Sequence, residues 1–178
     1  NFDDCTIPKE NLVGWRGGGM PDVLKFLAEE GSNIQAGATV LGTARAAYEA
    51  AVERAKERFI GGKIMIHHQL THHKLASMKM RLDAARAYLY RAAYNIDSPD
   101  EENDYSMAPM AKVFAATTAF DVTKEALELF GAYGYMKDYP MEKYLRDAAS
   151  FLHSDGVNDV LLIRAARLLY DLPAEMFQ

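Results

Sequence analysis

Residues 67–96, HHQLTHHKLASMKMRLDAARAYLYRAAYNI, carry the longest regular pattern in the sequence. Apolar side chains recur there at alternating intervals of three and four residues, at Leu75, Met78, Leu82, Ala85, Leu89 and Ala92. This spacing places them along one face of an α-helix, where they form a seam that packs against neighbouring helices. The stretch therefore predicts a long amphipathic helix and a helical fold around it.

A second helical pattern precedes this one. From about Asn33 to Phe59, small apolar residues recur at helical spacing, and Gly61 and Gly62 follow as a stop signal. The small residues are Val40, Ala44, Ala47, Ala51 and Ala55. Because alanine lets two helix axes approach closely, this stretch predicts close contact with another helix.

The second half of the sequence carries two more helical patterns. After a polar turn over residues 97–105, a third helix is predicted to end at Gly131, and a last helix follows Gly156. Their apolar positions are Ala115, Ala119, Val122, Ala126 and Leu129 in the third helix, and Leu161, Ala165 and Leu168 in the last. Since the connections are short and no strand alternation is present, the sequence predicts an all-α fold, an antiparallel four-helix bundle.

Residues 1–20 differ from the rest in composition. They contain Pro8 and the run GWRGGG over residues 14–19, with little periodicity, which predicts loop after a short strand remnant. Residues 21–178 are then predicted to form one helical domain. A chain of 178 residues that is 49% hydrophobic is long enough to give such a domain a core of its own.

Composition and charge restrict the expected partners. Lysine and arginine number 20 against 25 aspartate and glutamate, a formal net charge of −5, so no basic surplus favours nucleic acid. Cys5 is the single cysteine and cannot form an intrachain disulfide. No apolar run approaches the roughly 18 to 20 residues needed to cross a bilayer, and no signal pattern opens the chain. We therefore expect a soluble chain, cytoplasmic if its source is bacterial.

Four histidines form an HHxxxHH cluster at His67, His68, His72 and His73. His68 and His72 lie one helical turn apart, a spacing that is compatible with a transition metal. No cysteine or carboxylate joins them locally, and surface histidines on a helix are usually solvated. We therefore expect no metal site.

Residues 146–167, RDAASFLHSDGVNDVLLIRAAR, place an acid, Asp155, in a short polar break between two helical patterns. A carboxylate at such a break lies at the mouth of a bundle, where it is suited to act as a catalytic base. An aspartate before Gly156 is also a sound N-cap for the last helix. The two interpretations are compatible.

This segment resembles the stretch around the catalytic base of the acyl-CoA dehydrogenases. Several other stretches match the C-terminal domain of that family in the same order. They are FDDCTIPKENLVG (2–14), GTARAAYEAAVERAKERF (42–59), HHQ (67–69), LASM (75–78), ELFGAYGY (128–135) and YPMEKYLRDA (139–148). The resemblance implies that residues 1–20 are the end of a middle β domain and a linker, and that residues 21–178 are the C-terminal helical bundle. It also implies that an N-terminal helical domain and most of the middle domain lie outside this chain, which would then be one part of a catalyst.

The resemblance implies FAD as cofactor, bound between the middle domain and the bundle and completed by a neighbouring subunit. Arg58 matches the arginine that contacts the cofactor pyrophosphate, for which a fixed fork of donors is chemically suited. A basic residue in the last turn of a helix also complements the helix dipole, so Arg58 has a structural interpretation as well. The cofactor-contacting positions implied by the family are Arg58, Phe59, Ile60, His68, Gln69, Glu128, Leu129, Phe130, Gly131, Ala132, Val157 and Asp159.

The activity implied by the resemblance is α,β-dehydrogenation of an acyl-CoA thioester. Asp155 occupies the position of the base that removes the α-proton while a hydride passes to flavin N5. Its backbone N–H would help to bind the thioester oxygen, an oxyanion-type contribution. Substrate contacts are implied at Glu30, Asn33, Gly156 and Arg167. The implied partners are a homo-oligomer, tetramer or dimer, and an electron-transferring flavoprotein as acceptor.

The sequence departs from the family pattern around Asp155. The family usually has glutamate there, and the shorter aspartate withdraws the carboxylate by about one C–C bond, ~1.5 Å. A misplacement of ~1 Å can cost ~100-fold in rate, so an unadjusted aspartate would serve an ordinary acyl-CoA poorly. Three further positions differ from the family pattern: Asn33 replaces an arginine, Val157 replaces a threonine, and Asp159 replaces a glutamate or glutamine.

Three interpretations remain open at this point. The chain is part of a dehydrogenase with a reshaped substrate such as a cyclic carboxyl-CoA, for which branches of the family use aspartate. Alternatively it is a non-catalytic partner subunit or oligomerisation bundle in a heteromeric dehydrogenase. A divergent oxidase that acts on nitroalkanes is disfavoured, because Leu162 stands where that branch uses an arginine.

Overall fold

The computed structural model describes residues 1–19, 31–98 and 103–172. These residues are mostly helical with almost no strand, which confirms the all-α class. The long helices are α2 (Ser32–Glu57), α3 (Gln69–Asp97) and α4 (Met107–Phe130), followed by α6 (Met141–Ser150) and α7 (Asn158–Tyr170). The short elements are the 3-10 helices η1 (Lys9–Asn11) and η2 (Met65–His67), the helix α5 (Ala132–Tyr135), and the strands β1 (Phe59–Ile60) and β2 (Lys63–Ile64).

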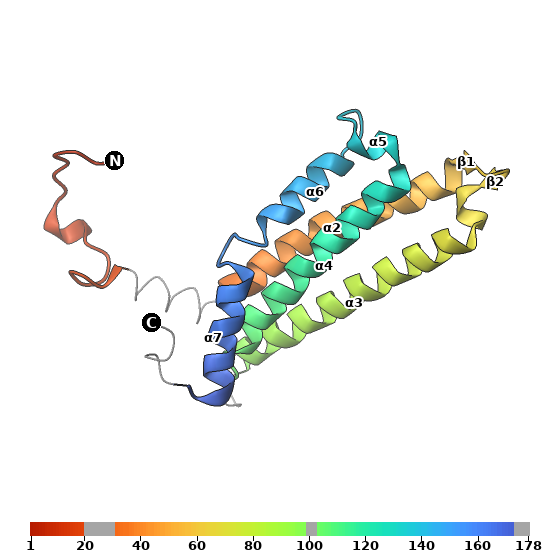
Figure 1. Cartoon of the computed structure of the whole chain (residues 1–178). Coiled ribbons are helices and arrows are strands. Elements are labelled where there is room, and N and C mark those ends of the chain that lie inside the picture. The colour runs from red at the N-terminus through yellow and green to blue at the C-terminus, as the bar shows by residue number, and fades with distance from the viewer. Residues whose placement is uncertain (20–30, 99–102, 173–178) are drawn as a thin grey trace.

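The helices α2, α3, α4 and α6 run up and down beside one another, and α7 lies across one end (Figure 1). The antiparallel bundle is therefore present, but its fourth helix is α6, which the helical periodicity did not indicate. A helix of ten residues shows too few turns for a clear periodic pattern, although it buries Met141 and Ala148. The predicted last helix, α7, packs against α4 through Leu161 and Ala165, while Leu168 is half exposed.

The core is built where α2 and α4 pack against each other through small side chains. All five small residues predicted for α2 are fully buried, as are Ala115, Ala119, Val122 and Ala126 of α4. Gly37 shows how close this packing is, because a Cβ there would lie 2.7 Å from Leu89 Cδ2 and 3.4 Å from the Lys112 Cα. The predicted close helix contact is therefore confirmed.

Helix α3 buries its predicted seam against α2 and α4. Leu75, Met78, Leu82, Ala85, Leu89 and Ala92 are all buried. Its outer face carries the exposed ion pair of Lys79 and Asp83 together with exposed Met80, Tyr90 and Tyr94. None of the helices formed by the described residues is long and apolar enough to cross a membrane.

A tight hairpin joins α2 to α3. Phe59 pairs with Ile64 and Ile60 with Lys63 in an antiparallel register. Gly61 and Gly62 form the turn with φ of 57° and 84°, left-handed values that glycine adopts without strain and that suit a two-residue hairpin. The predicted stop after the first helix is thus confirmed.

Residues 1–19 form loop and the single turn η1 rather than the expected strand remnant. A strand needs a partner to satisfy its backbone groups. Within the described parts of the chain, the strands β1 and β2 pair only with each other, so residues 1–19 have no such partner.

Candidate functional site

The site residues predicted from the sequence lie at the two opposite ends of α2. We call one the loop end: it comprises Asn33, the 151–157 loop between α6 and α7, and helix α7. The other, the hairpin end, comprises residues 58–69 and 128–135. The 26 residues of α2 separate the two ends, a length of about 39 Å at 1.5 Å per residue. Figure 1 shows the hairpin β1–β2 and α5 at one end and α7 at the other.

At the loop end, Asp155 and Gly156 make a left-handed turn with φ of 52° and 99°. Aspartate tolerates this region better than most residues, but glycine alone adopts it freely. A Cβ on Gly156 would also lie 2.8 Å from Leu161 Cδ2. Gly156 is therefore required by both its backbone angle and its packing on α7.

Asn33 at the start of α2 holds this turn from one side. Its Nδ2 donates a hydrogen bond of 3.0 Å to the backbone oxygen of Asp155, across 122 residues of sequence. Its side chain is buried, and Oδ1 finds no partner among the described residues. The residue expected near the base is thus beside it, where it anchors the backbone.

Lys112 of α4 holds the same turn from the other side, and the sequence analysis missed it. The side chain is fully buried. Its Nζ donates to the backbone oxygens of Phe151 at 2.7 Å and Gly156 at 2.9 Å, and to Asn158 Oδ1 at 2.9 Å. Burial lowers the pKa of Lys112, and the Asp155 carboxylate opposes that effect. The available signal was a lysine at helical spacing from Ala108, Ala115 and Ala119, which are buried in the structure.

The Asp155 carboxylate itself is exposed, and its backbone N–H finds no acceptor within the described part of the chain. The N-cap interpretation of Asp155 was wrong, because α7 begins at Asn158 and its N-cap is Val157. The turn at Asp155 and Gly156 places the acid three residues before the helix. Asp155 is therefore available to a ligand and is not used in capping.

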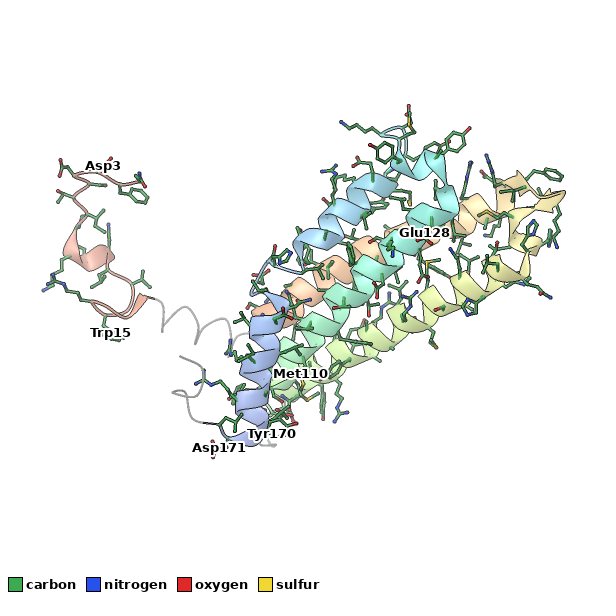
Figure 2. All side chains as sticks on the ribbon, in the orientation of Figure 1. Asp3, Trp15, Met110, Glu128, Tyr170 and Asp171 are labelled. Atoms are coloured by element: carbon green, nitrogen blue, oxygen red, sulfur yellow. The ribbon has the colours of Figure 1, made fainter. Side chains whose placement is uncertain are left out.

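The remaining residues predicted for this end lie along α7. Val157 is the N-cap of α7 and Asp159 is the second residue of that helix, and both are exposed beside the turn. The backbone oxygen of Arg167 closes the far end of that helix by accepting from Asp171 and Leu172; Figure 2 labels Asp171 there. Arg167 is thus nine residues along α7 from Asn158, roughly 14 Å from the start of that helix. Glu30 lies outside the described residues.

At the hairpin end, Arg54 of α2 and Arg58, the C-cap of that helix, face an aromatic ring. The guanidinium carbons of Arg54 and Arg58 lie 4.8 and 5.6 Å from the centre of the Tyr133 ring, within cation–π range. Phe59 and Ile60 follow with 65% and 48% of their surface exposed. A cation beside exposed apolar side chains is a combination suited to binding an anionic group attached to an apolar or aromatic one.

His68 supports this hairpin through a hydrogen bond of 2.8 Å between its Nε2 and the Ile60 backbone oxygen. Its neighbour Gln69 is exposed at the first residue of α3. Among the described residues, no three histidine, cysteine or acidic side chains gather as a metal site would require.

The end of α4 completes the hairpin end. Lys74 of α3 donates to Glu128 at 2.9 Å and lowers the pKa of that carboxyl; Figure 2 labels Glu128 on α4. Lys74 and Glu128 are among the residues that line a hollow of about 340 Å³ between α3 and α4. Gly131 is the C-cap of α4 with φ of 62°, in agreement with the predicted helix stop, and a Cβ at this position would meet no heavy atom of the described residues within 4 Å.

The hydrophobic side chains in this stretch are less available than its backbone. Phe130 is buried, with its ring 5.6 Å from that of Tyr139, and Leu129 is half buried. Gly131 and Ala132 are exposed. The exposed glycine and alanine, with the nearby Arg58, fit the close approach of a cofactor to the backbone.

Comparisons with known proteins identify the family of this helical bundle. The family model described as "Acyl-CoA dehydrogenase, C-terminal domain" matches residues 17–170. The mitochondrial isobutyryl-CoA dehydrogenase of Dictyostelium discoideum is 37% identical over 168 residues, which are 94% of this chain and 40% of that protein. The cyclohexane-1-carbonyl-CoA dehydrogenase of Geobacter metallireducens is 32% identical over 93% of this chain and 43% of that protein.

The fold is also that of a solved relative. The structure of butyryl-CoA dehydrogenase from Megasphaera elsdenii superposes with a TM-score of 0.85 at 36% identity, covering 94% of this chain and 43% of that one. The chain therefore spans less than half the length of these relatives. With its helical bundle, its loop-end acid and a family match over most of its residues, this chain belongs to the acyl-CoA dehydrogenase family and corresponds to that family's C-terminal domain.

Proposed function

We propose that this chain is the C-terminal domain of a FAD-dependent acyl-CoA dehydrogenase in which Asp155 is the base that removes the α-proton. One observation carries the proposal: the Asp155 carboxylate is exposed on a turn that buried side chains of two other helices hold. A base must sit within hydrogen-bond reach of the proton that it removes, so a fixed backbone under an accessible carboxylate meets that requirement.

The chemistry at Asp155 uses its side chain and its backbone together. The carboxylate takes the α-proton, and the backbone N–H, which finds no acceptor within the described residues, donates to the thioester oxygen. That bond stabilises the negative charge that develops on the oxygen as the proton leaves. When bound, FAD supplies the acceptor for the β-hydrogen, which leaves with its electron pair.

The two ends of α2 serve two different cofactor molecules in this proposal. About 39 Å separates them, which exceeds the length of an extended dinucleotide. The loop end with Asp155, Val157 and Asp159 would contribute to one site, and the hairpin end with Arg58 and Gly131 to a second. A second copy of the chain would then complete each site, which agrees with the homo-oligomer that the family resemblance implies.

The substrate we favour is an acyl-CoA with a bulky or cyclic acyl group. Asp155 is shorter than glutamate by ~1.5 Å, so a substrate must bring its α-carbon closer to the Asp155 backbone. The similarity to a cyclohexane-1-carbonyl-CoA dehydrogenase supports this class of substrate. An electron-transferring flavoprotein is the proposed acceptor of the electrons, as the family resemblance implies.

The test is an Asp155→Asn variant of the full-length protein, reconstituted with FAD and mixed anaerobically with cyclohexane-1-carbonyl-CoA and butyryl-CoA. We expect the wild-type flavin absorbance to bleach with one of them and the variant to bleach at least ~100-fold more slowly. The matched control is Asp83→Asn, which removes an exposed acid paired with Lys79 on α3. Unchanged bleaching in Asp155→Asn would show that Asp155 is not the base, and no bleaching in the wild type would favour a non-catalytic bundle.

A further inference from the structure

We propose that Lys112 is the positioning residue of this site, and that its ammonium group sets the backbone of the turn that carries Asp155. The inference rests on the proposed role of Asp155 and extends it to a residue on a different helix. Lys112 lies 43 residues before Asp155 in the sequence, and it touches no group that is proposed to react.

The ammonium group has its three donors matched to three acceptors. Phe151 is the C-cap of α6, Gly156 belongs to the turn, and Asn158 is the first residue of α7. Lys112 therefore joins the end of one helix, the turn and the start of the next helix. An ammonium is suited to this position, because the carbonyl oxygens at a helix C-terminus carry partial negative charge.

The cation is costly to keep at this place in the fold. It is fully buried, and its three hydrogen bonds to described residues go to neutral oxygens rather than to a carboxylate. Burying a charge with neutral partners is unfavourable relative to an apolar side chain of the same size. A requirement for bundle stability alone would therefore favour an apolar residue at position 112, whereas a requirement to fix the turn explains the lysine.

The contacts determine how Asp155 is presented. Asn33 binds the backbone oxygen of Asp155 and Lys112 binds that of Gly156, so two consecutive peptide planes are each held by a side chain. Because a peptide unit is planar, fixing its oxygen also fixes the orientation of the atoms bonded to it. The two planes are those of the Asp155–Gly156 and Gly156–Val157 peptides, the first of which begins at the Asp155 Cα, so the direction of the Asp155 side chain depends on α2 and α4 together.

The experiment compares Lys112→Met with Arg81→Met in the full-length FAD enzyme. Arg81 is a matched control, because it is a largely buried cation that joins α3 to α4 through Glu125 at 2.7 Å, away from the turn. We expect Lys112→Met to lower kcat per bound flavin by about 100-fold with KM changed less than about threefold. Arg81→Met should keep its kcat even if its melting temperature falls by as much as that of Lys112→Met.

A double variant separates positioning from general damage. If Lys112 acts through Asp155, then Lys112→Met should reduce the residual rate of Asp155→Asn by less than about threefold, because the two changes remove the same function. Equal reductions in both backgrounds would overturn the inference, as would a full kcat in Lys112→Met. Should Lys112→Met fail to fold, Asn158→Ala removes one of the three acceptors from α7 and should lower kcat in the same Asp155-dependent way.

The same measurements distinguish failure of this inference from failure of the proposed function. If Asp155→Asn is inactive but Lys112→Met keeps its kcat, only the role of Lys112 is wrong. If Asp155→Asn is fully active, the proposed base is wrong and the inference falls with it.

Discussion

At the loop end, buried side chains far apart in the sequence hold the backbone, whereas at the hairpin end the backbone is held by a near neighbour and the long-range contacts join partly exposed side chains. Asn33 and Lys112 reach the turn at Asp155 across 122 and 44 residues. The Ile60 backbone, in contrast, is held by His68 only eight residues away. Long-range contacts from buried side chains keep a backbone fixed to the core. Under the proposed function, this fixed backbone orients one reacting group.

The hairpin end is built differently because it presents a surface. Its candidate residues are largely exposed, among them Phe59, Ile60, Gly131 and Ala132. Arg54 and Arg58 are held over a tyrosine ring and have no ion pair with an acid in the described part of the chain. An open surface with unpaired cations suits a site that another chain completes. The two ends should thus respond differently to substitution.

The largest effect is expected from changing the reach of the carboxylate at the loop end. Asp155→Glu lengthens the side chain by ~1.5 Å. The specificity, expressed as a ratio of kcat/KM values, should therefore shift toward the straight-chain acyl-CoA by about 100-fold. The measurement is the ratio of kcat/KM for butyryl-CoA to that for cyclohexane-1-carbonyl-CoA. Glu128→Asp is the matched control at the hairpin end, and its ratio should stay constant. An unchanged ratio in Asp155→Glu would show that the length of this side chain does not select the substrate.

A smaller effect is expected from the turn itself. Gly156→Ala places a methyl group 2.8 Å from Leu161 Cδ2 at a φ of 99°, and we expect it to lower the free energy of unfolding by about 2 kcal/mol. Denaturant titration of the full-length protein measures this change. The control is Gly42→Ala in α2, where a Cβ meets nothing within 4 Å, and there stability should be unchanged or rise by up to ~1 kcal/mol. Equal stability of the two variants would contradict the strained turn.

The smallest effect is expected at the hairpin end. Arg58→Met should weaken FAD binding by about 10-fold, equivalent to ~1.4 kcal/mol, because it removes one charge-assisted contact to the pyrophosphate. Flavin release measured by fluorescence tests this in the full-length protein. Arg45→Met, which removes an exposed partner of Glu49 on the same helix, should leave the affinity unchanged. Equal affinity in both variants would place the pyrophosphate elsewhere.

Most of the fold could be predicted because periodic burial is a local signal. The seam from Leu75 to Ala92 and the alanines of α2 are buried as predicted. Helix α6 was not named, because ten residues provide few repeats of the period. Asp155 was wrongly considered an N-cap, because a backbone turn of two left-handed residues leaves no clear sign in side-chain chemistry.

The sequence by itself determined the helices, their stops at Gly61 and Gly131, and the position of an acid between two of them, since each depends on neighbours within a few residues. Only the tertiary structure decided that Asn33 and Lys112 hold the turn of Asp155 and that the candidate residues divide between two distant ends. Those contacts join segments separated by 44 to 122 residues. Such contacts depend on how the helices pack, and periodicity along one helix does not specify the pairing of side chains across the bundle.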